Sequence, residues 1–261
     1  MNNSPIGVYD SGFGGLSVWR ELRRLLPHES LLYLGDGKNC PYGGRSRAEI
    51  EGFAIEAVER LVEEGVKMVV VGCNTATTAA VETLRRRWPD MPIVGLEPAV
   101  KPACLTSQTR KIAVLATEHS LKSDMFLATA ERWASDVEVV KVVGEGFVEL
   151  VERDMEHTPE AENLVRKAVE PLLGRGVDRL VLGCTHYPFL RPIIERVVEG
   201  SGIEVIDSGA AVARRVEWLL DRYDIAAAED NLPQMRYITF ADEEYRKRLE
   251  HKAQTIINMD K

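Results

Sequence analysis

An internal repeat is the feature of this chain that most constrains its fold. Residues 57–73 read AVERLVEEGVKMVVVGC and residues 168–184 read AVEPLLGRGVDRLVLGC, which agree at nine of seventeen positions without a gap. Each copy contains a helical pattern, a glycine, an apolar run and a Gly-Cys pair. The cysteines that end the copies, Cys73 and Cys184, are 111 residues apart. We therefore predict two related halves, each presenting a thiol at the same structural point.

Short apolar runs alternate with helix-patterned segments, which is typical of an α/β fold with parallel sheets covered on both faces. The predicted fold is two pseudo-symmetric, mostly parallel-sheet α/β domains that face each other across a cleft. The predicted strands cover residues 6–9, 31–34, 68–71 and 93–96 in the first half, and 111–116, 137–143, 180–182 and 204–206 in the second.

The tail of the chain has no counterpart in the first half. Its pattern predicts a helix over residues 210–223, a strand over 236–240 and a final charged helix. We expect this tail to return and complete the first half. The predicted domains are therefore 1–97 together with 208–261, which carries Cys73, and 98–207, which carries Cys184.

Charge and hydropathy exclude several classes of protein. A net charge of −8 argues against a broad nucleic-acid surface. No apolar run approaches the ~20 residues that a membrane-spanning helix needs, and the first residues lack the basic and apolar regions of a signal peptide. We therefore expect a cytoplasmic protein with no nucleic-acid or membrane partner.

The four cysteines do not have the spacing of a zinc site or a C-x-x-C pair. No metal site is therefore predicted. In a reducing compartment the four cysteines should be free thiols. Cys40 and Cys104 are interpreted as small buried hydrophobic residues. Cys73 and Cys184 differ because the repeat places both at one equivalent position.

Each repeated cysteine follows an apolar strand and leads into a predicted helix. The carboxyl ends of strands in an open parallel sheet are where ligands bind, and a helix N-terminus favours thiolate over thiol. Asn74-Thr75 and Thr185-His186 follow directly and offer donors for a carboxylate. A tight strand–helix turn would explain a single copy, but two copies favour a functional pair of acid/base groups. Such a pair is expected for a reaction whose forward and reverse directions are mirror images of each other.

Four other residues are candidates at the same edges, each with a plainer alternative. Asp10, in the Gly-rich segment after the first strand, is either part of a turn or a proton relay for a thiol. Tyr42 lies in a Gly- and Pro-rich segment that is either a surface loop or a cover whose hydroxyl donates to a ligand. His186 is either structural or a partner of Cys184. Glu152 is either an exposed glutamate or a residue that orients His186 or binds an ammonium group.

The strings VYDSGFGGLSV, YLGD…CPYG, GCNTATTAA and LGCTHYPFL resemble those of glutamate racemases, in the cofactor-independent aspartate/glutamate racemase superfamily. The resemblance runs over nearly the full length. It implies interconversion of L- and D-glutamate, which supplies D-glutamate for peptidoglycan, without pyridoxal phosphate or metal. It also implies a homodimer, and the start of the chain lacks the extension that binds a peptidoglycan precursor in some members.

The resemblance also implies roles for individual residues. Cys73 would take the Cα proton from D-glutamate and Cys184 from L-glutamate, assisted by Asp10 and His186 respectively, with Glu152 as a further catalytic residue. The substrate-binding positions that it implies are Asp10, Ser11, Tyr42, Gly43, Asn74, Thr75, Thr117, Thr185 and His186. The sequence departs from the usual family pattern at residues 37–39 and 144–145, where we expect effects on loop motion and on the wall of the second half rather than on activity.

Three alternatives stay open at this point. The substrate could instead be aspartate or a hydantoin on the same scaffold. The protein could be a two-lobed amino-acid binding protein without catalysis, although the doubled cysteine argues against this. A redox role for the two thiols is a weaker hypothesis.

Overall fold

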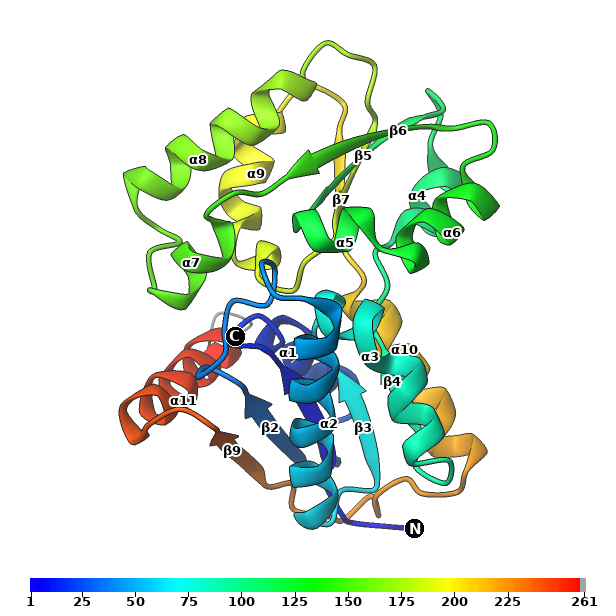
Figure 1. The fold of residues 1–261 in the computed structure, drawn as a ribbon, viewed down its shortest axis with the longest axis vertical. Helices are drawn as coiled ribbons and strands as arrows, with labels where there is room; N and C mark the ends of the chain where they lie inside the picture. Colours follow the sequence, from blue (N-terminus) through cyan, green and yellow to red (C-terminus); the bar gives the residue numbers. More distant parts are fainter. Residues whose placement is uncertain (259–261) are drawn as a thin grey trace. The chain divides into compact units, whose positions relative to one another are not determined.

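The computed structural model describes residues 1–258. The chain divides into two compact units. Unit 1 comprises Met1–Leu96 and Gly209–Lys261, and unit 2 comprises Glu97–Ser208. Each unit contains one sheet with helices on both of its faces (Figure 1).

The sheet of unit 1 has five strands in the order β4-β3-β1-β2-β9, and all of its pairings are parallel. Its first four strands are almost entirely buried, which explains why they are continuous apolar runs rather than alternating ones. The strands are β1 (Ile6–Asp10), β2 (Leu31–Gly35), β3 (Met68–Val71), β4 (Ile93–Gly95) and β9 (Met235–Thr239).

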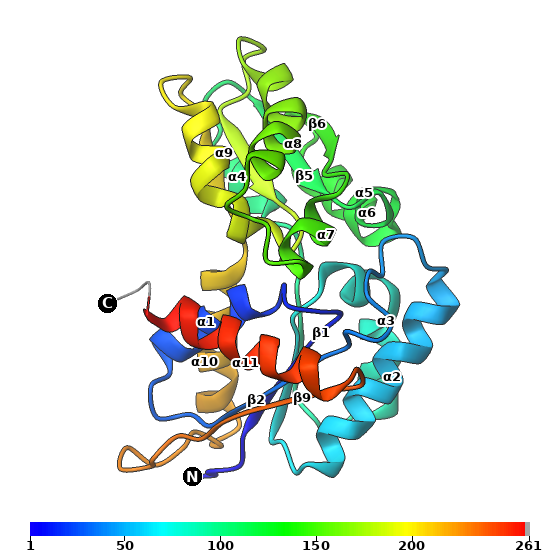
Figure 2. The ribbon, with the colours of Figure 1, turned by 90° about the vertical axis from the view of Figure 1, so that its left-hand side faces the viewer.

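Helices α2 and α3 cover one face of this sheet, and α1, α10 and α11 cover the other (Figure 2). Local signals set their ends: Ser46 and Glu49 form a reciprocal capping box at the start of α2, which ends just before Gly65. The bounds are α1 (Leu16–Leu25), α2 (Arg47–Glu63), α3 (Asn74–Arg87), α10 (Gly209–Arg222) and α11 (Glu243–Asn258).

The sheet of unit 2 has four parallel strands in the order β6-β5-β7-β8. They are β5 (Lys111–Ala116), β6 (Glu138–Val143), β7 (Arg179–Leu182) and β8 (Glu204–Ile206). One face packs in a core with α4 (Val100–Thr106), α5 (Glu118–Lys122) and α6 (Asp124–Trp133).

The other face of this sheet is covered by α8 (Pro159–Val169) and α9 (Arg191–Val198), beside the short helix α7 (Phe147–Glu152) (Figure 1). The Thr158 side chain caps α8 by accepting from the Ala161 N–H, with Pro159 in the first turn. Two 3₁₀ segments, η1 (Glu170–Leu172) and η2 (Tyr187–Leu190), complete the unit.

The internal repeat is confirmed at the level of topology. Strands β4-β3-β1-β2 of unit 1 and β8-β7-β5-β6 of unit 2 follow the same order, so β3 and β7 are equivalent, as are the cysteines that follow them. The α/β class and the parallel sheets are therefore as predicted. Strand β9, from the tail, extends unit 1 by pairing with β2, with Leu32 opposite Arg236.

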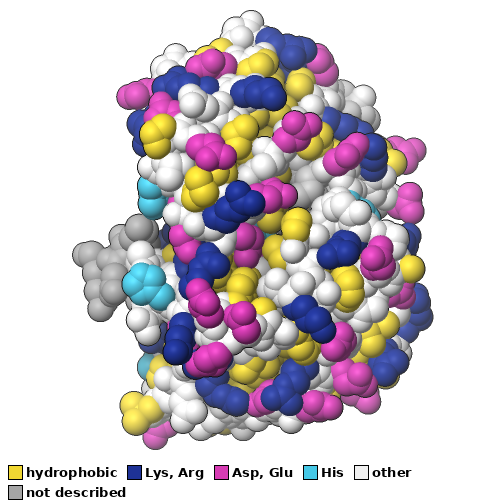
Figure 3. Space-filling view, turned by 60° about the vertical axis from the view of Figure 1, so that its left-hand side comes forward, with side chains coloured by type: hydrophobic (Ala, Val, Ile, Leu, Met, Phe, Trp, Pro, Cys, Tyr) yellow, Lys and Arg dark blue, Asp and Glu magenta, His cyan; other side chains and the backbone are white. Residues whose placement is uncertain are grey.

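The surface is charged with both signs. On the face shown in Figure 3, acidic and basic side chains are interspersed rather than separated into two large fields. Among residues 1–258, no helix combines the length and the hydropathy needed to cross a bilayer.

Candidate active site

In unit 1, neighbouring strands bring Ser11 and Cys73 together. Strands β1 and β3 pair in register, with Tyr9 opposite Val71, so the residues that follow them lie at the same edge of the sheet. The Oγ atom of Ser11 lies 3.5 Å from Sγ of Cys73. A hydroxyl at this distance can donate to a thiolate or accept from a thiol.

The glycine before each cysteine is required by close backbone packing. The Gly72 N–H donates to the Tyr9 carbonyl at 2.6 Å, and a Cβ at Gly72 would lie 3.2 Å from that oxygen. In unit 2, the Gly183 N–H donates to the Leu115 carbonyl at 2.8 Å, and a Cβ there would lie 2.9 Å from Cβ of Ala116. The Gly-Cys pair therefore places each thiol directly after an inner strand of its sheet, β3 or β7.

Cys73 occupies the N-cap position of α3, and its sulfur accepts a hydrogen bond from the Ala76 N–H at 3.4 Å. This N–H is one of those that a helix leaves unpaired at its first turn. The bond and the positive end of a 14-residue helix both favour the thiolate form of a side chain that is buried.

Asp10 is fully buried at the end of β1. Its carboxylate accepts a hydrogen bond from the Gly12 N–H at 2.8 Å, which closes the turn that presents Ser11. The strand-end position of Asp10 is thus as the sequence predicts. Its proposed role as a proton relay remains a proposal.

The hydroxyl of Tyr42 is engaged inside unit 1, contrary to the expectation that it donates to a ligand. It donates to Oδ2 of Asp36 at 2.6 Å and lies 2.7 Å from the hydroxyl of Tyr9. Since a phenol has one hydrogen, Tyr9 is the donor in the second bond. Burial and the neighbouring charges of Tyr9 and Asp36 raise the pKa of Tyr42, which keeps it protonated. Any contact of Tyr42 and Gly43 with a substrate would therefore come from their backbone.

Two members of this network, Asp36 and Tyr9, are not predicted as site residues from the sequence. Asp36 immediately follows β2, so the strand-end rule that identified Asp10 also applies to it. Tyr9 lies inside a buried apolar strand and reads as a core residue. Burial, followed by the charge of Cys73, raises the pKa of Tyr9 well above its usual value.

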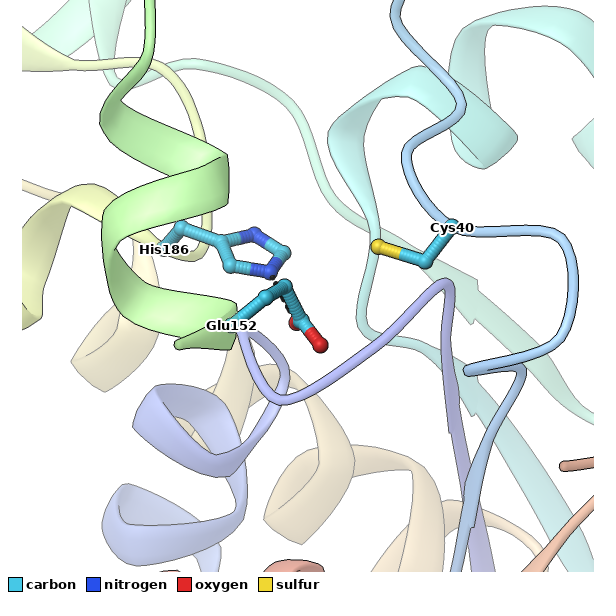
Figure 4. A group of neighbouring side chains, drawn as sticks. All are labelled: Cys40, Glu152 and His186. Atoms are coloured by element: carbon cyan, nitrogen blue, oxygen red, sulfur yellow. Dashed lines mark hydrogen bonds and ion pairs between the residues drawn. The ribbon is translucent and has the colours of Figure 1, made fainter. Parts of the chain in front are cut away.

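In unit 2, Cys184, His186 and Glu152 form a hydrogen-bonded row. Nδ1 of His186 lies 3.8 Å from Sγ of Cys184, and Nε2 lies 2.7 Å from Oε1 of Glu152. Figure 4 shows the Glu152 carboxylate at the end of α7 meeting the imidazole ring. Burial alone would lower the pKa of His186, but the hydrogen bonds and charges of Cys184 and Glu152 outweigh it, so the pKa lies well above its usual value.

The surroundings of Cys184 differ from those predicted. No α-helix begins directly after it; the chain first forms η2, and α9 starts only at Arg191. Pro188 is the physical reason, since it disfavours helical geometry at Tyr187 and lacks an N–H. A histidine and a glutamate therefore stand where α3 supports Cys73, so the two thiol sites are equivalent in position but not in chemistry.

The remaining predicted residues lie at strand or helix ends. Thr117 follows β5 and caps α5 by accepting from the Ser120 N–H at 3.2 Å. Thr185 is buried beside Cys184, and Asn74 and Thr75 are buried in the first turn of α3.

Within either unit taken by itself, the described residues hold no group of three or more His, Cys, Asp or Glu side chains close enough to share a metal ion.

Comparison with known proteins places these sites in a family. The model of Asp/Glu/Hydantoin racemase matches residues 14–216, a stretch that contains both Gly-Cys sites. The chain belongs to the Asp/Glu/Hydantoin racemase family. A glutamate racemase of Ectopseudomonas mendocina is 48% identical over 231 residues, which is 88% of each chain.

Solved structures of glutamate racemases have the same fold as this chain. Glutamate racemase isoform RacE1 from Bacillus anthracis superposes with a TM-score of 0.85 at 33% identity, covering 99% of this chain and 95% of that one. The Escherichia coli glutamate racemase, solved with L-glutamate and the activator UDP-MurNAc-Ala, gives a TM-score of 0.86 at 31% identity, covering 97% and 95%. The racemase family resemblance predicted from the sequence motifs is therefore confirmed.

Proposed function

We propose that this protein is a glutamate racemase that interconverts L- and D-glutamate through two cysteine acid/base groups. One observation carries the proposal: a cysteine follows each of two topologically equivalent strands, β3 and β7, in a chain of the racemase family. Racemisation is the reaction for which two equivalent bases are needed, one for each face of the same carbon. The substrate is taken from the glutamate racemases that share most of this chain's length.

In the proposed mechanism, one cysteine thiolate removes the Cα proton and the other cysteine, as a thiol, delivers a proton to the opposite face. The C–H electron pair stays on Cα as the first thiol forms, and it then takes the second thiol's proton. Atoms and charge balance over the cycle, with the two sulfurs exchanging protonation states. Cys73 would act on D-glutamate and Cys184 on L-glutamate.

The thiolate of Cys73 is supported from unit 1. The Ala76 N–H and the Ser11 hydroxyl both lie within hydrogen-bonding reach of its sulfur. Charge-assisted bonds to a thiolate lower its basicity without removing it. Asp10 would serve as a proton relay that takes the proton from the Cys73 thiol.

The thiolate of Cys184 is supported from unit 2 by the imidazole of His186. With its pKa raised by hydrogen bonds to Cys184 and Glu152, this ring carries a proton that it can share with the sulfur. Glu152 orients the ring and stabilises its positive charge. His186 is therefore the assisting residue on this side, in place of a helix N-terminus.

A carbanion at Cα must be stabilised through the α-carboxylate, since no other electron acceptor is part of the proposal. Among the described residues, the buried side-chain nitrogen of Asn74 has no hydrogen-bond partner. A buried donor left in this state costs about 1–3 kcal/mol, which a substrate carboxylate would recover. Asn74, with Ser11, Thr75, Thr117 and Thr185, would bind this group more tightly as charge develops on it.

The biological setting follows from this activity. D-Glutamate made by the enzyme would enter peptidoglycan synthesis, so we propose a cytoplasmic enzyme. We also propose a homodimer, which is what the family resemblance implies. A net charge of −8 and the mixed charges in Figure 3 support small-molecule rather than nucleic-acid partners.

Deuterium exchange tests the proposal directly. Each glutamate enantiomer is incubated with the protein in deuterated water, and both Cα deuteration and chirality are followed. A racemase forms the opposite enantiomer with deuterium at Cα from either starting material. A protein that binds glutamate without exchanging its Cα hydrogen would refute the proposal, and parallel assays with aspartate and a hydantoin identify a different substrate.

A further inference from the structure

The C-terminal helix places one aromatic ring on the loop that follows β1. Tyr245, in the first turn of α11, stacks on Phe13 with ring centroids 4.7 Å apart and an interplanar angle of 26°. Phe13 is two residues beyond Ser11 in the chain. Figure 2 shows α11 beside α1, the helix that this loop begins. The ring from the end of the chain thus packs against the turn that presents Asp10 and Ser11.

The same ring also packs against the loop that follows β2. A side chain at Gly37 would overlap the ring of Tyr245, so the backbone at this position lies directly against the aromatic ring. Gly37 follows Asp36, which accepts the hydroxyl hydrogen of Tyr42. The two loops are neighbours, since the Asp36 N–H donates to the Asp10 carbonyl at 2.9 Å.

The rest of α11 fixes where Tyr245 lies. Arg248 and Lys252 place their charges 5.2 and 5.5 Å from the centroid of the Phe13 ring, and Leu249 is fully buried. These positions follow Tyr245 at i+3, i+7 and i+4, which is one face of a helix. The helix that carries Tyr245 is therefore held on this loop at several points.

We infer that Tyr245 is a positioning residue for the reaction proposed above. Through its contacts with Phe13 and Gly37, it holds together the loop of Asp10 and Ser11 and the loop of Asp36 and Tyr42. This inference rests on the proposed function, because those loops matter for rate only if Cys73 is an acid/base group. A purely structural ring would affect unfolding and leave the kinetics of the folded enzyme unchanged.

Three variants of the full chain test the inference: Tyr245→Ala removes the ring, Tyr245→Phe keeps it, and Tyr223→Ala removes a tyrosine that is 54% exposed elsewhere in unit 1. Tyr245→Ala should lower kcat/KM roughly 10- to 100-fold, as expected when reacting groups lose their alignment. The fall must be equal for L- and D-glutamate, since the enantiomers have equal free energy in water. Tyr245→Phe and Tyr223→Ala should match wild type. Normal kcat/KM in Tyr245→Ala would overturn the inference.

Hydrogen exchange read by mass spectrometry gives a second readout that needs no activity. Tyr245→Ala should speed amide exchange in residues 11–15 and 36–44, and Tyr223→Ala should not. Unchanged exchange in both loops would overturn the inference even in an active enzyme. A wild-type protein that does not racemise glutamate would instead overturn the proposed function, so the two failures can be told apart.

Gly37→Ala supplies a test that leaves α11 itself unchanged. The added methyl should lower kcat/KM when Tyr245 is present, because it must displace the ring. In the Tyr245→Ala background it should cause little further loss, which makes the double-variant cycle strongly non-additive. Equal losses in both backgrounds, or no loss in either, would contradict the contact on which the inference depends.

Discussion

Nε2 of His186 lies 2.7 Å from Oε1 of Glu152, so a carboxylate at the end of α7 fixes the ring whose other nitrogen faces Cys184. The hydrogen bonds with Cys184 and Glu152 raise the pKa of His186 against the opposing effect of burial. We therefore expect the two sides of the site to respond differently to pH, because Cys73 lies at a helix N-terminus, which does not titrate.

Glu152→Gln should shift the pH dependence of racemisation. Without the carboxylate, the pKa of His186 falls, so the protonated ring is lost at lower pH than in wild type. The alkaline limb of kcat/KM against pH should therefore move to lower pH. The profile is measured with Glu160→Gln, an exposed glutamate of α8, as the matched control. An alkaline limb that stays in place would show that His186 does not act through its protonated form.

Each thiol should be indispensable. Cys73→Ala and Cys184→Ala should each reduce racemisation by at least roughly 1,000-fold, within the range attributed to positioned acid/base groups. Cys40→Ala and Cys104→Ala remove the two other thiols and should leave most of the activity. The measurement is the loss of optical rotation from each enantiomer. Near-normal turnover in either of the first two variants would end the two-base mechanism.

Tyr42→Phe should affect stability more than substrate binding. The variant removes the Tyr42 donor to Asp36, whose Oδ2 then keeps the bond from Asn39, and it removes the acceptor of the Tyr9 hydroxyl, at a cost of about 1–3 kcal/mol. Because the hydroxyl is engaged within unit 1, KM for glutamate should stay close to the wild-type value. Thermal unfolding and steady-state kinetics are compared in one preparation. A large rise in KM with unchanged unfolding would assign the hydroxyl to the substrate instead.

Asp178 should contribute stability that depends on pH. Burial alone would raise the pKa of Asp178, but bonds from the Ser107 hydroxyl and the Gln108 and Thr109 N–H groups lower it by more. A carboxyl whose pKa is lower when folded stabilises the protein above its unfolded pKa, near ~3.9. That stability is lost as the pH falls through the folded pKa.

Asp178→Asn should therefore destabilise unit 2 by about 1–3 kcal/mol at neutral pH, with the difference from wild type shrinking in acid. Asp136→Asn is the control, since its partner Arg110 and Asp136 itself are both exposed. Unfolding midpoints across a pH series check the prediction. A difference that is constant with pH would mean that the hydrogen bonds, and not the charge, carry the effect.

Much of the fold is predictable from the sequence because its strands are buried on both faces. Strand β5 begins and ends at the predicted residues, and β1 and β2 extend only one residue further, to Asp10 and Gly35. The equivalence of β3 and β7 follows from the repeat, since the same apolar pattern specifies the same position in each sheet.

Features that depend on contacts between distant segments are not predictable in this way. The local pattern predicts a helix directly after Cys184. In the structure α9 begins only at Arg191, because Pro188 disfavours an earlier start. From the sequence, the Tyr42 hydroxyl is expected to be available to a ligand. Nothing in its own loop indicates that the hydroxyl of Tyr9, in strand β1, lies 2.7 Å from it. Tyr245 lies in a charged terminal helix and gives no signal of its contact with Gly37, more than two hundred residues earlier.

The pairing of β9 with β2 has a consequence for synthesis on the ribosome. Strand β2 emerges early, but the segment that covers its outer edge, Met235–Thr239, is translated after all of unit 2. Unit 2 is a continuous stretch of chain and can complete its own sheet first. Unit 1, which contains the N-terminus, therefore completes its sheet last. Until then it exposes an apolar strand edge of the kind that chaperones protect from aggregation.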